Sequence, residues 1–546
     1  MKKSVIVIAI LLATFSLFSQ NSTNQKPTLV VGIVIEQMRY DYLVRYWDKF
    51  SEHGFKKLVN QGTFCKNAHY DYLNINSASG YATISSGCYP AQHGVIDKKW
   101  YDRLTRKEVS CVEDETTFPI GTKFGKGASP KRLSTTTWTD QLRISTYKMS
   151  KVYSVGFNDY ASVLSVGKIA NTGFWFDENT GNWVTSSYYV DSLEIWTQTF
   201  NDRKFADIYM QKTWNTTFPI SKYTESLSDE TNYEIGLGGQ NTFPYDLDAL
   251  KKKFNNYSLL KFTPFANTLT KDFAINLLMN EYLGRDSYTD VLMINFAATT
   301  YISDVFGIQS VELQDAYIKL DKDIAHLISA LDEFVGMNNV VVFVTSDRGA
   351  CDNIQWLKDI NIQVGEFNAK RTIVMLNSYL RAIYGMSNWV DGYYGNHIYL
   401  DHFEIDKAKV SVDEMQTKAA QLFAGLTGVS TIIPTNSLLK GTYSTGIMKK
   451  AQNSYFQSRS GDLAIVLDYG WRFQNDGKIS LSECSSGYNE NTHVPLIFYG
   501  WKIPHQEIYR FISLDALAVT LSFILDISLP NKATGEPIEE VLRNLN

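Results

Sequence analysis

Apolar, largely β-branched runs recur along the chain and are separated by polar and turn-forming segments. Four of them stand out: Thr28–Ile35, Val291–Phe296, Asn339–Thr345 and Val494–Tyr499. A strand that is apolar along its whole length is typical of a sheet buried on both faces, since a half-buried strand would alternate apolar and polar residues. The pattern therefore predicts a central, largely parallel sheet.

Helical periodicity appears between these runs. Over residues 310–334, apolar side chains such as Ile324, Leu327 and Leu331 recur every three or four positions. Strands that alternate with helices predict an α/β fold, in which the sheet lies between layers of helices. In such a fold, functional side chains gather at the carboxyl ends of the strands.

Two stretches depart from this alternation and are predicted to be inserted cap subdomains. Residues 175–257 are rich in aromatic and polar side chains, and residues 364–469 have a mixed pattern. The Asn-Thr-Gly sequence at 179–181 predicts a hairpin turn between two aromatic strands around Trp175 and Trp183. We expect this hairpin to pack as a lid, or to contact a ligand or partner.

The N-terminus has the pattern of a targeting segment. Lys2 and Lys3 precede the apolar run Val5–Phe18, which is shorter than the about 20 residues of a transmembrane helix. This pattern predicts a signal peptide over residues 1–22, followed by a domain over 28–546 that does not span a membrane. We expect an exported protein of the periplasm, which a partner could hold at the outer membrane.

Composition narrows the classes of function. Hydrophobic residues make up 44% of the chain and charged residues 20%, which excludes a disordered chain. The net charge is -5, from 52 basic and 57 acidic residues, so the basic excess of a nucleic-acid-binding protein is absent. The five cysteines form no CxxC pair, and an odd number leaves at least one of them unpaired.

Short motifs follow one another in a set order through the mature chain. They are VVGIVIEQMRYDYL (30–43), HYDYLNINSASGYATISSGCYPAQHG (69–94), KKWYD (98–102), TWTDQL (137–142), TGFWFDENTG (172–181), FANTLT (265–270), INFAATTYISDVFG (294–307), VTSDRGA (344–350) and HVPLIFYGW (493–501). Together they resemble alkaline phosphatases of the phosphodiesterase/nucleotide-pyrophosphatase branch, notably the phosphate-irrepressible enzymes of Bacteroidota. The resemblance implies an alkaline-phosphatase-like sandwich with a central sheet between helices.

The same resemblance implies a catalytic site with two zinc ions about 4 Å apart and a hydroxyl nucleophile. The nucleophile position carries Ser77. The six ligand positions carry, in chain order, Glu36, Thr300, Asp304, Asp347, Arg348 and Cys484. Three of these positions are His in the family, and none is His here, so most of the nitrogen and carboxylate ligands that zinc needs are lost.

Arg348 opposes metal binding directly, because a guanidinium cannot ligate a cation and does not lose its proton. At an effective dielectric near 20, unit charges about 4 Å apart interact by about 4 kcal/mol. We therefore expect no cofactor, with zinc as the alternative. We also expect Arg348 to fill the vacated space and to bridge Glu36 and Asp347 through bidentate bonds.

The positions that grip the phosphoryl group have changed as well. A Lys-x-Arg pair of the family corresponds to Asn158 and Tyr160, and a phosphate-binding Asn corresponds to Lys98. Losing the metals and this clamp removes most of the electrostatic stabilisation that such a reaction uses.

Three functions remain in competition. The first is a catalytically inactive protein that acts as a binding or scaffolding subunit, whose partner is another cell-envelope protein. The second is a metal-dependent phosphomonoesterase or phosphodiesterase with an altered metal centre and Ser77 as nucleophile. The third is a non-catalytic binder of a phosphorylated or sugar ligand through Lys98 and Arg348.

Overall fold

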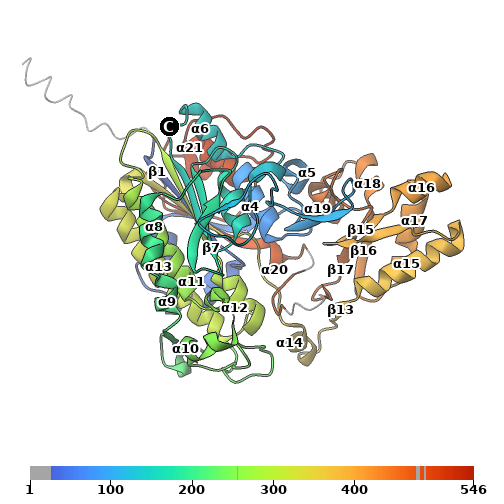
Figure 1. The fold of residues 1–546 in the computed structure, drawn as a ribbon, viewed down its shortest axis with the longest axis horizontal. Helices are drawn as coiled ribbons and strands as arrows, with labels where there is room; N and C mark the ends of the chain where they lie inside the picture. The colour runs from blue at the N-terminus through green and yellow to red at the C-terminus, as the bar shows by residue number, and fades with distance from the viewer. Residues whose placement is uncertain (1–25, 255, 475–479, 485–486, 546) are drawn as a thin grey trace, which may run out of the picture.

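The computed structural model describes residues 26–254, 256–474, 480–484 and 487–545. The signal peptide predicted over residues 1–22 lies outside this part of the chain. A large body carries the central sheet, and a smaller lobe extends from it at the right of Figure 1. None of the helices in the described ranges has the length and apolar character needed to cross a bilayer.

Eleven strands form the central sheet, in the order β20-β2-β19-β12-β1-β11-β6-β7-β8-β5, with β21 beside β2. Their bounds are β1 (Leu29–Ile35), β2 (Thr63–His69), β5 (Pro119–Ile120), β6 (Val152–Gly156), β7 (Thr172–Asp177), β8 (Asn182–Ser186), β11 (Asp290–Phe296), β12 (Val340–Thr345), β19 (His493–Gly500), β20 (Gln506–Ile508) and β21 (Ile512–Ser513). The run from β12 through β1, β11 and β6 to β7 is parallel, whereas β19 is antiparallel to both β12 and β2. The predicted, largely parallel sheet is therefore confirmed, with the four predicted strands near its centre.

Helices cover both faces of the sheet, and β1 accordingly places its side chains in two separate apolar cores. Leu29, Val31 and Ile33 enter one core, and Val30 and Val34 enter the other. The first core includes α11 (Phe265–Asn280), α12 (Ala298–Phe306) and α13 (Val311–Phe334), and the second includes α4 (Ser77–Ser86), α6 (Trp138–Ser145), α7 (Asp159–Val166) and α21 (Ala516–Ile524). The helix predicted over 310–334 is confirmed as α13, whose N-cap Ser310 accepts a hydrogen bond from the Leu313 amide.

The predicted aromatic hairpin is present, but it is not a lid. Its strands β7 and β8 pair Phe176 with Trp183 and form part of the central sheet near one end. Trp183 is 1% exposed and stacks on Phe273 of α11 at 4.6 Å between ring centroids. The hairpin belongs to the core because β7 pairs with β6 in the central sheet and because Phe174 and Trp183 are buried against Phe273 of α11. The short helices α8 (Ile195–Asp202), α9 (Phe205–Tyr209) and α10 (Leu247–Leu250) follow it.

The smaller lobe falls within the second predicted insertion, 364–469. Its antiparallel sheet has the order β14-β15-β17-β16, with bounds β14 (Val390–Tyr394), β15 (His397–Leu400), β16 (Val429–Pro434) and β17 (Leu463–Leu467). The helices α15 (Ala369–Tyr384), α16 (His402–Ala408) and α17 (Val412–Phe423) pack on this sheet around a core of their own. The helices α18 (Thr435–Lys440) and α19 (Gly446–Ser454) complete the lobe on the side of the body, where α19 contacts α5 (Pro90–His93).

Candidate functional site

A cleft of about 190 Å³ opens where the parallel strands of the body end. Glu36 directly follows β1, and Asp347 comes two residues after β12, so both lie at the same edge of the sheet. Side chains from the body and from the lobe side line the cleft. They include Ser77, Lys98 and Arg348 from the body, and Tyr393, Arg472 and Phe473 from the other wall.

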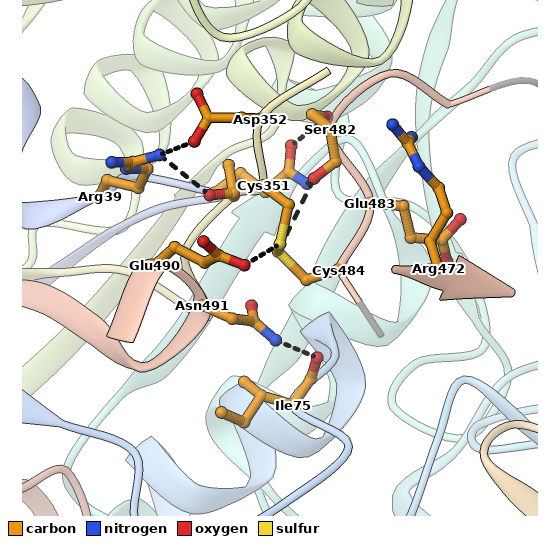
Figure 2. Close-up of a disulfide and its surroundings, with 12 residues drawn as sticks. Arg39, Ile75, Cys351, Asp352, Arg472, Ser482, Glu483, Cys484, Glu490 and Asn491 are labelled. Carbon is orange, nitrogen blue, oxygen red and sulfur yellow. Dashed lines mark hydrogen bonds and ion pairs between the residues drawn. A yellow bond between two sulfur atoms is a disulfide. The ribbon is translucent and has the colours of Figure 1, made fainter. Parts of the chain in front are cut away.

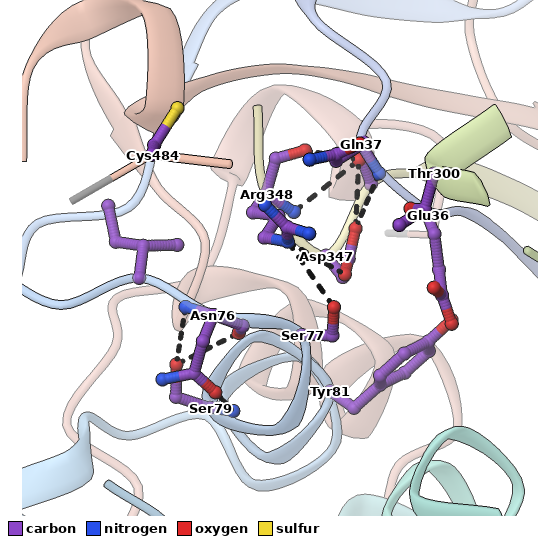
Figure 3. Close-up of polar contacts among 12 residues, drawn as sticks. Glu36, Gln37, Asn76, Ser77, Ser79, Tyr81, Thr300, Asp347, Arg348 and Cys484 are labelled. Atoms are coloured by element: carbon purple, nitrogen blue, oxygen red, sulfur yellow. Dashed lines mark hydrogen bonds and ion pairs between the residues drawn. The ribbon is translucent and has the colours of Figure 1, made fainter. Parts of the chain in front are cut away.

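Ser77 is the first residue of α4 and is held there by a capping box. The Asn76 side chain accepts a hydrogen bond from the Ser79 amide at 3.0 Å, and Ser79 Oγ accepts one from the Asn76 amide at 3.2 Å. This reciprocal pairing satisfies amides that a helix start leaves free. Ser77 is fully buried, and its Oγ accepts a hydrogen bond from Arg348 Nε at 3.3 Å (Figure 3).

Arg348 lies inside the site and is only 6% exposed. With the Gln37 amide assigned so that its oxygen faces donors, that oxygen accepts hydrogen bonds from both terminal guanidinium nitrogens, at 2.7 and 3.0 Å. Burial alone would lower the pKa of Arg348, but the carboxylates of Asp347 and Asp304 raise it above its ordinary value. The guanidinium is therefore a permanent buried cation.

The predicted bridge from Arg348 is confirmed as an ion pair toward Asp347, but it is not bidentate, and no contact between Arg348 and Glu36 is found among the described residues. Arg348 Nε lies 3.9 Å from Asp347 Oδ2, an ion-pair distance that is longer than a hydrogen bond. Gln37 takes the bidentate role instead. Its backbone is left-handed (φ 59°), so its backbone N–H donates to Asp347 Oδ1 at 2.8 Å while its side-chain amide faces the guanidinium of Arg348. Figure 3 shows Gln37 beside Arg348 and Asp347.

Glu36 is bound by neutral donors instead. Its Oε1 accepts hydrogen bonds from Asn158 Nδ2 at 2.9 Å and from the Tyr81 hydroxyl at 3.3 Å. Burial, together with the charge of Asp347, raises the pKa of Glu36 to about 7. Asn158 thus faces this carboxylate, and its Oδ1 accepts a further hydrogen bond from Tyr301.

The two site residues on α12, Thr300 and Asp304, differ in their hydrogen bonding. Asp304 accepts hydrogen bonds from Ser480 and Ser482, the latter at 2.9 Å, and burial raises its pKa. Thr300 is 4% exposed, and its hydroxyl has no partner within the described residues. Asp304 is therefore held by two serine hydroxyls, and these donors differ from the ones that hold Glu36 and Asp347.

Cys484 lines the cleft but is not a thiolate, because it forms a disulfide with Cys351 (Figure 2). The Cα atoms lie 5.3 Å apart, and 133 positions separate the two cysteines in the sequence. The carboxylate of Glu490 lies 3.0 Å from the Cys351 sulfur. A metal-ligand role carried over to Cys484 is thus contradicted in this oxidised form, since both sulfurs are used in the covalent bond.

Lys98 and Tyr160 remain beside the cleft. Lys98 Nζ lies 4.8 Å from the centre of the Tyr160 ring, a distance suited to a cation–π contact. Arg472 is a third cation on the cleft wall that sequence reasoning missed, and burial lowers its pKa. No motif marks Arg472, because only the pairing of β13 (Glu366–Phe367) with β18 (Arg472–Phe473) brings it to the cleft.

The residues present do not fit a pair of zinc ions. Zinc sites use His nitrogen, Cys thiolate and carboxylate ligands arranged around the metal, whereas here an arginine, an amide and a disulfide occupy that space. Among the described residues, one group of three potential ligands has donor atoms within 4.8 Å of each other: Cys351, Cys484 and Glu490. Its two sulfurs are bonded to one another, so they offer no thiolate.

Comparison with known proteins identifies the family. Residues 30–493 match the sequence model of type I phosphodiesterase/nucleotide pyrophosphatase. The chain belongs to this family. The match includes the whole lobe and the body up to the start of β19.

The chain is also similar in sequence to known proteins along almost their whole length. A protein of Myroides odoratus named calcium-transporting ATPase is 35% identical over 524 residues, and alkaline phosphatase PafA of Elizabethkingia meningoseptica is 34% identical over 521 residues. Each alignment covers 95% of both chains. The crystal structure of wild-type PafA superposes with a TM-score of 0.89 and covers 94% of this chain and 99% of that one. The resemblance to alkaline phosphatases drawn from the motifs is thereby confirmed.

Proposed function

We propose that this family member is an exported, catalytically inactive protein that acts as a binding or scaffolding subunit of the cell envelope. One observation carries the proposal: a buried arginine, Arg348, donates a hydrogen bond to the hydroxyl at the nucleophile position, Ser77. A hydroxyl becomes a nucleophile only when a base or a metal takes its proton. Arginine can do neither, because it accepts no proton at ordinary pH.

Within the described part of the chain, no carboxylate or imidazole is hydrogen-bonded to Ser77. Among the described residues, Arg348 is the side chain that is hydrogen-bonded to Ser77 Oγ. Glu36 is held by Asn158 and Tyr81, and the Asp347 carboxylate accepts from the Gln37 amide. A dication near these carboxylates would also meet the charge of Arg348, which argues against a metal-activated serine.

The cleft keeps features of a binding site for anions. Lys98, Arg348 and Arg472 contribute three positive charges to its lining, against the two carboxylates of Asp97 and Glu483. Arginine side chains suit phosphate and carboxylate groups, because their donors are planar and paired. We therefore propose that the binding role includes an anionic ligand, such as a phosphate ester, that is held without turnover.

The proposed partner is another protein of the cell envelope, and the proposed location is the periplasm. Support comes from the sequence of residues 1–22, which has the pattern of a signal peptide. No metal cofactor is part of the proposal.

A phosphomonoesterase or phosphodiesterase with an altered metal centre is the second candidate. It is favoured by the position of Ser77, whose hydroxyl lies at the N-terminus of α4, where partial positive charge lowers the cost of an anion. It is also favoured by the relatives that carry the name alkaline phosphatase.

Metal content and turnover separate the two candidates. Mature protein refolded or purified with zinc present, and then desalted, should retain no stoichiometric zinc. Its hydrolysis of a generic aryl phosphate should not exceed that of Ser77→Ala. Stoichiometric zinc together with Ser77-dependent hydrolysis would overturn the inactive assignment. Inorganic phosphate should bind, and the binding should weaken at least tenfold in Lys98→Ala but not in Lys99→Ala, a variant of the exposed neighbouring lysine.

A further inference from the structure

A second group of acidic side chains lies around the start of α13, apart from the cleft lining. It consists of Asp229, Glu234, Glu312 and Asp315. Asp315 is compensated, because Lys319 Nζ lies 3.2 Å from its Oδ2, and Tyr223 and Trp214 donate hydrogen bonds to it. No such cation pairs with the other three within the described part of the chain.

The three remaining carboxylates have oxygens without partners. Glu312 is fully buried; its Oε1 accepts a hydrogen bond from the Tyr245 hydroxyl at 2.6 Å, while its Oε2 has no partner among the described residues. Both oxygens of Glu234 and the Oδ1 of Asp229 are likewise buried and unpartnered there. In the described part of the chain, four oxygens of these carboxyl groups thus face no donor, which is costly for buried groups that are ionised.

Hydrogen bonds bring the segments that carry these carboxylates together, since Phe243 donates its amide to Asp229 and Tyr245, two residues later, donates its hydroxyl to Glu312. Burial raises the pKa of Glu234, and the charges of Glu312 and Asp229 raise it further. Burial likewise raises the pKa of Glu312. Tyr245 and Phe243, the latter donating its amide to Asp229 at 3.2 Å, are the donors found around these side chains, and neither carries charge.

We propose that Glu234 and Glu312 bind a hard divalent cation of the calcium class, with Asp229 at its margin. The unpartnered donors are all carboxylate oxygens, which suit Ca²⁺ rather than zinc or copper. Two carboxylates balance the charge of one dication. The three side chains do not all place an oxygen within 4.8 Å of one another, so the proposed site takes its direct ligands from Glu234 and Glu312, and water completes the shell. Ca²⁺ tolerates such an irregular set of six to eight oxygens, whereas Mg²⁺ demands an octahedron.

Terbium luminescence gives a direct readout of this site in the full-length mature protein. Tb³⁺ takes the oxygen ligands of Ca²⁺ and emits when an excited aromatic ring lies nearby. The Trp214 ring lies 5.4 Å from the Tyr245 ring, and Tyr245 is hydrogen-bonded to Glu312. Chelator-treated protein should show saturable Tb³⁺ emission that Ca²⁺ displaces. Glu234→Gln and Glu312→Gln should each weaken binding at least tenfold, whereas Glu333→Gln, on an exposed turn of the same helix, should not.

Thermal unfolding provides a second measurement that does not depend on luminescence. Ca²⁺ should raise the midpoint of the wild type and of Glu333→Gln and leave that of Glu234→Gln unchanged. In chelator, Glu234→Gln should be at least as stable as the wild type, because it removes a buried charge, and this shows that it folds. Equal Tb³⁺ binding by all variants, or a wild-type midpoint that Ca²⁺ does not move, would mean that protons alone neutralise these carboxylates and would overturn the proposal. Neither measurement involves the cleft, so the proposed function stands or fails separately.

Discussion

Replacing Arg348 with methionine tests whether this buried cation compensates the carboxylates of the cleft. Arg348 Nε lies 3.9 Å from Asp347 Oδ2, and both side chains are almost fully buried. At an effective dielectric near 20, that separation gives an attraction of about 4 kcal/mol. Removing one partner of a buried pair costs about 3–5 kcal/mol. We therefore expect Arg348→Met to lose about 3–5 kcal/mol of unfolding free energy at pH 8.

The double variant Arg348→Met/Asp347→Asn is the matched control, since it removes both charges and leaves the side-chain volumes nearly unchanged. Replacing both members of a buried pair is often close to neutral, so the double variant should be more stable than Arg348→Met alone. Urea unfolding followed by tryptophan fluorescence gives the midpoints, which compare directly when the slopes agree. An Arg348→Met midpoint equal to that of the wild type, or a double variant whose losses simply add, would refute the compensation.

Two further predictions concern residues around the cleft. A Cβ at Gly80 would lie 2.1 Å from the Asp347 carbonyl oxygen, so Gly80→Ala should displace the segment after β12 and lower the free energy of unfolding by about 1–3 kcal/mol. At Gly425 an added Cβ meets nothing within 4 Å, so Gly425→Ala should unfold at the wild-type urea midpoint. Burial raises the pKa of Glu490 from 4.5 to about 7, so the native state holds the proton of this carboxyl more tightly than the unfolded chain does. The contribution of Glu490 to the free energy of unfolding is therefore complete below pH 4.5 and is lost as the pH rises to 7. That loss is at most about 3 kcal/mol, and a pH series of unfolding midpoints should show it reduced in Glu490→Gln; parallel profiles would contradict this.

The sequence predicts the centre of the fold well, because the central strands are apolar throughout. β1, β11, β12 and β19 appear as continuous apolar runs, and α13 as a long amphipathic helix. The aromatic hairpin is predicted as a hairpin, yet its place in the central sheet is not, since its alternation fits an exposed cap equally well. The pairing of β7 with β6 and the packing of Trp183 on Phe273 show that the hairpin belongs to the central sheet.

The site is predicted in its members but not in their pairings. The motifs locate Glu36, Ser77 and Arg348, because Glu36 directly follows β1, Ser77 begins α4 and Arg348 comes three residues after β12. Contacts between them depend on backbone turns that no motif encodes. Gln37 rather than Glu36 contacts Arg348, because the positive φ of Gln37 turns its side chain toward the guanidinium. The adjacent residues Glu36 and Gln37 give no indication in the sequence of which one makes this contact.

The bond between Cys351 and Cys484 turns the smaller lobe into a closed loop of chain. All four strands of that lobe, from β14 to β17, lie between the two cysteines. A protease that cuts once within the lobe therefore leaves a single covalent molecule, which separates into two fragments only after reduction. Nicked protein would migrate as intact on a non-reducing gel, so damage to the lobe is visible only when thiol is added.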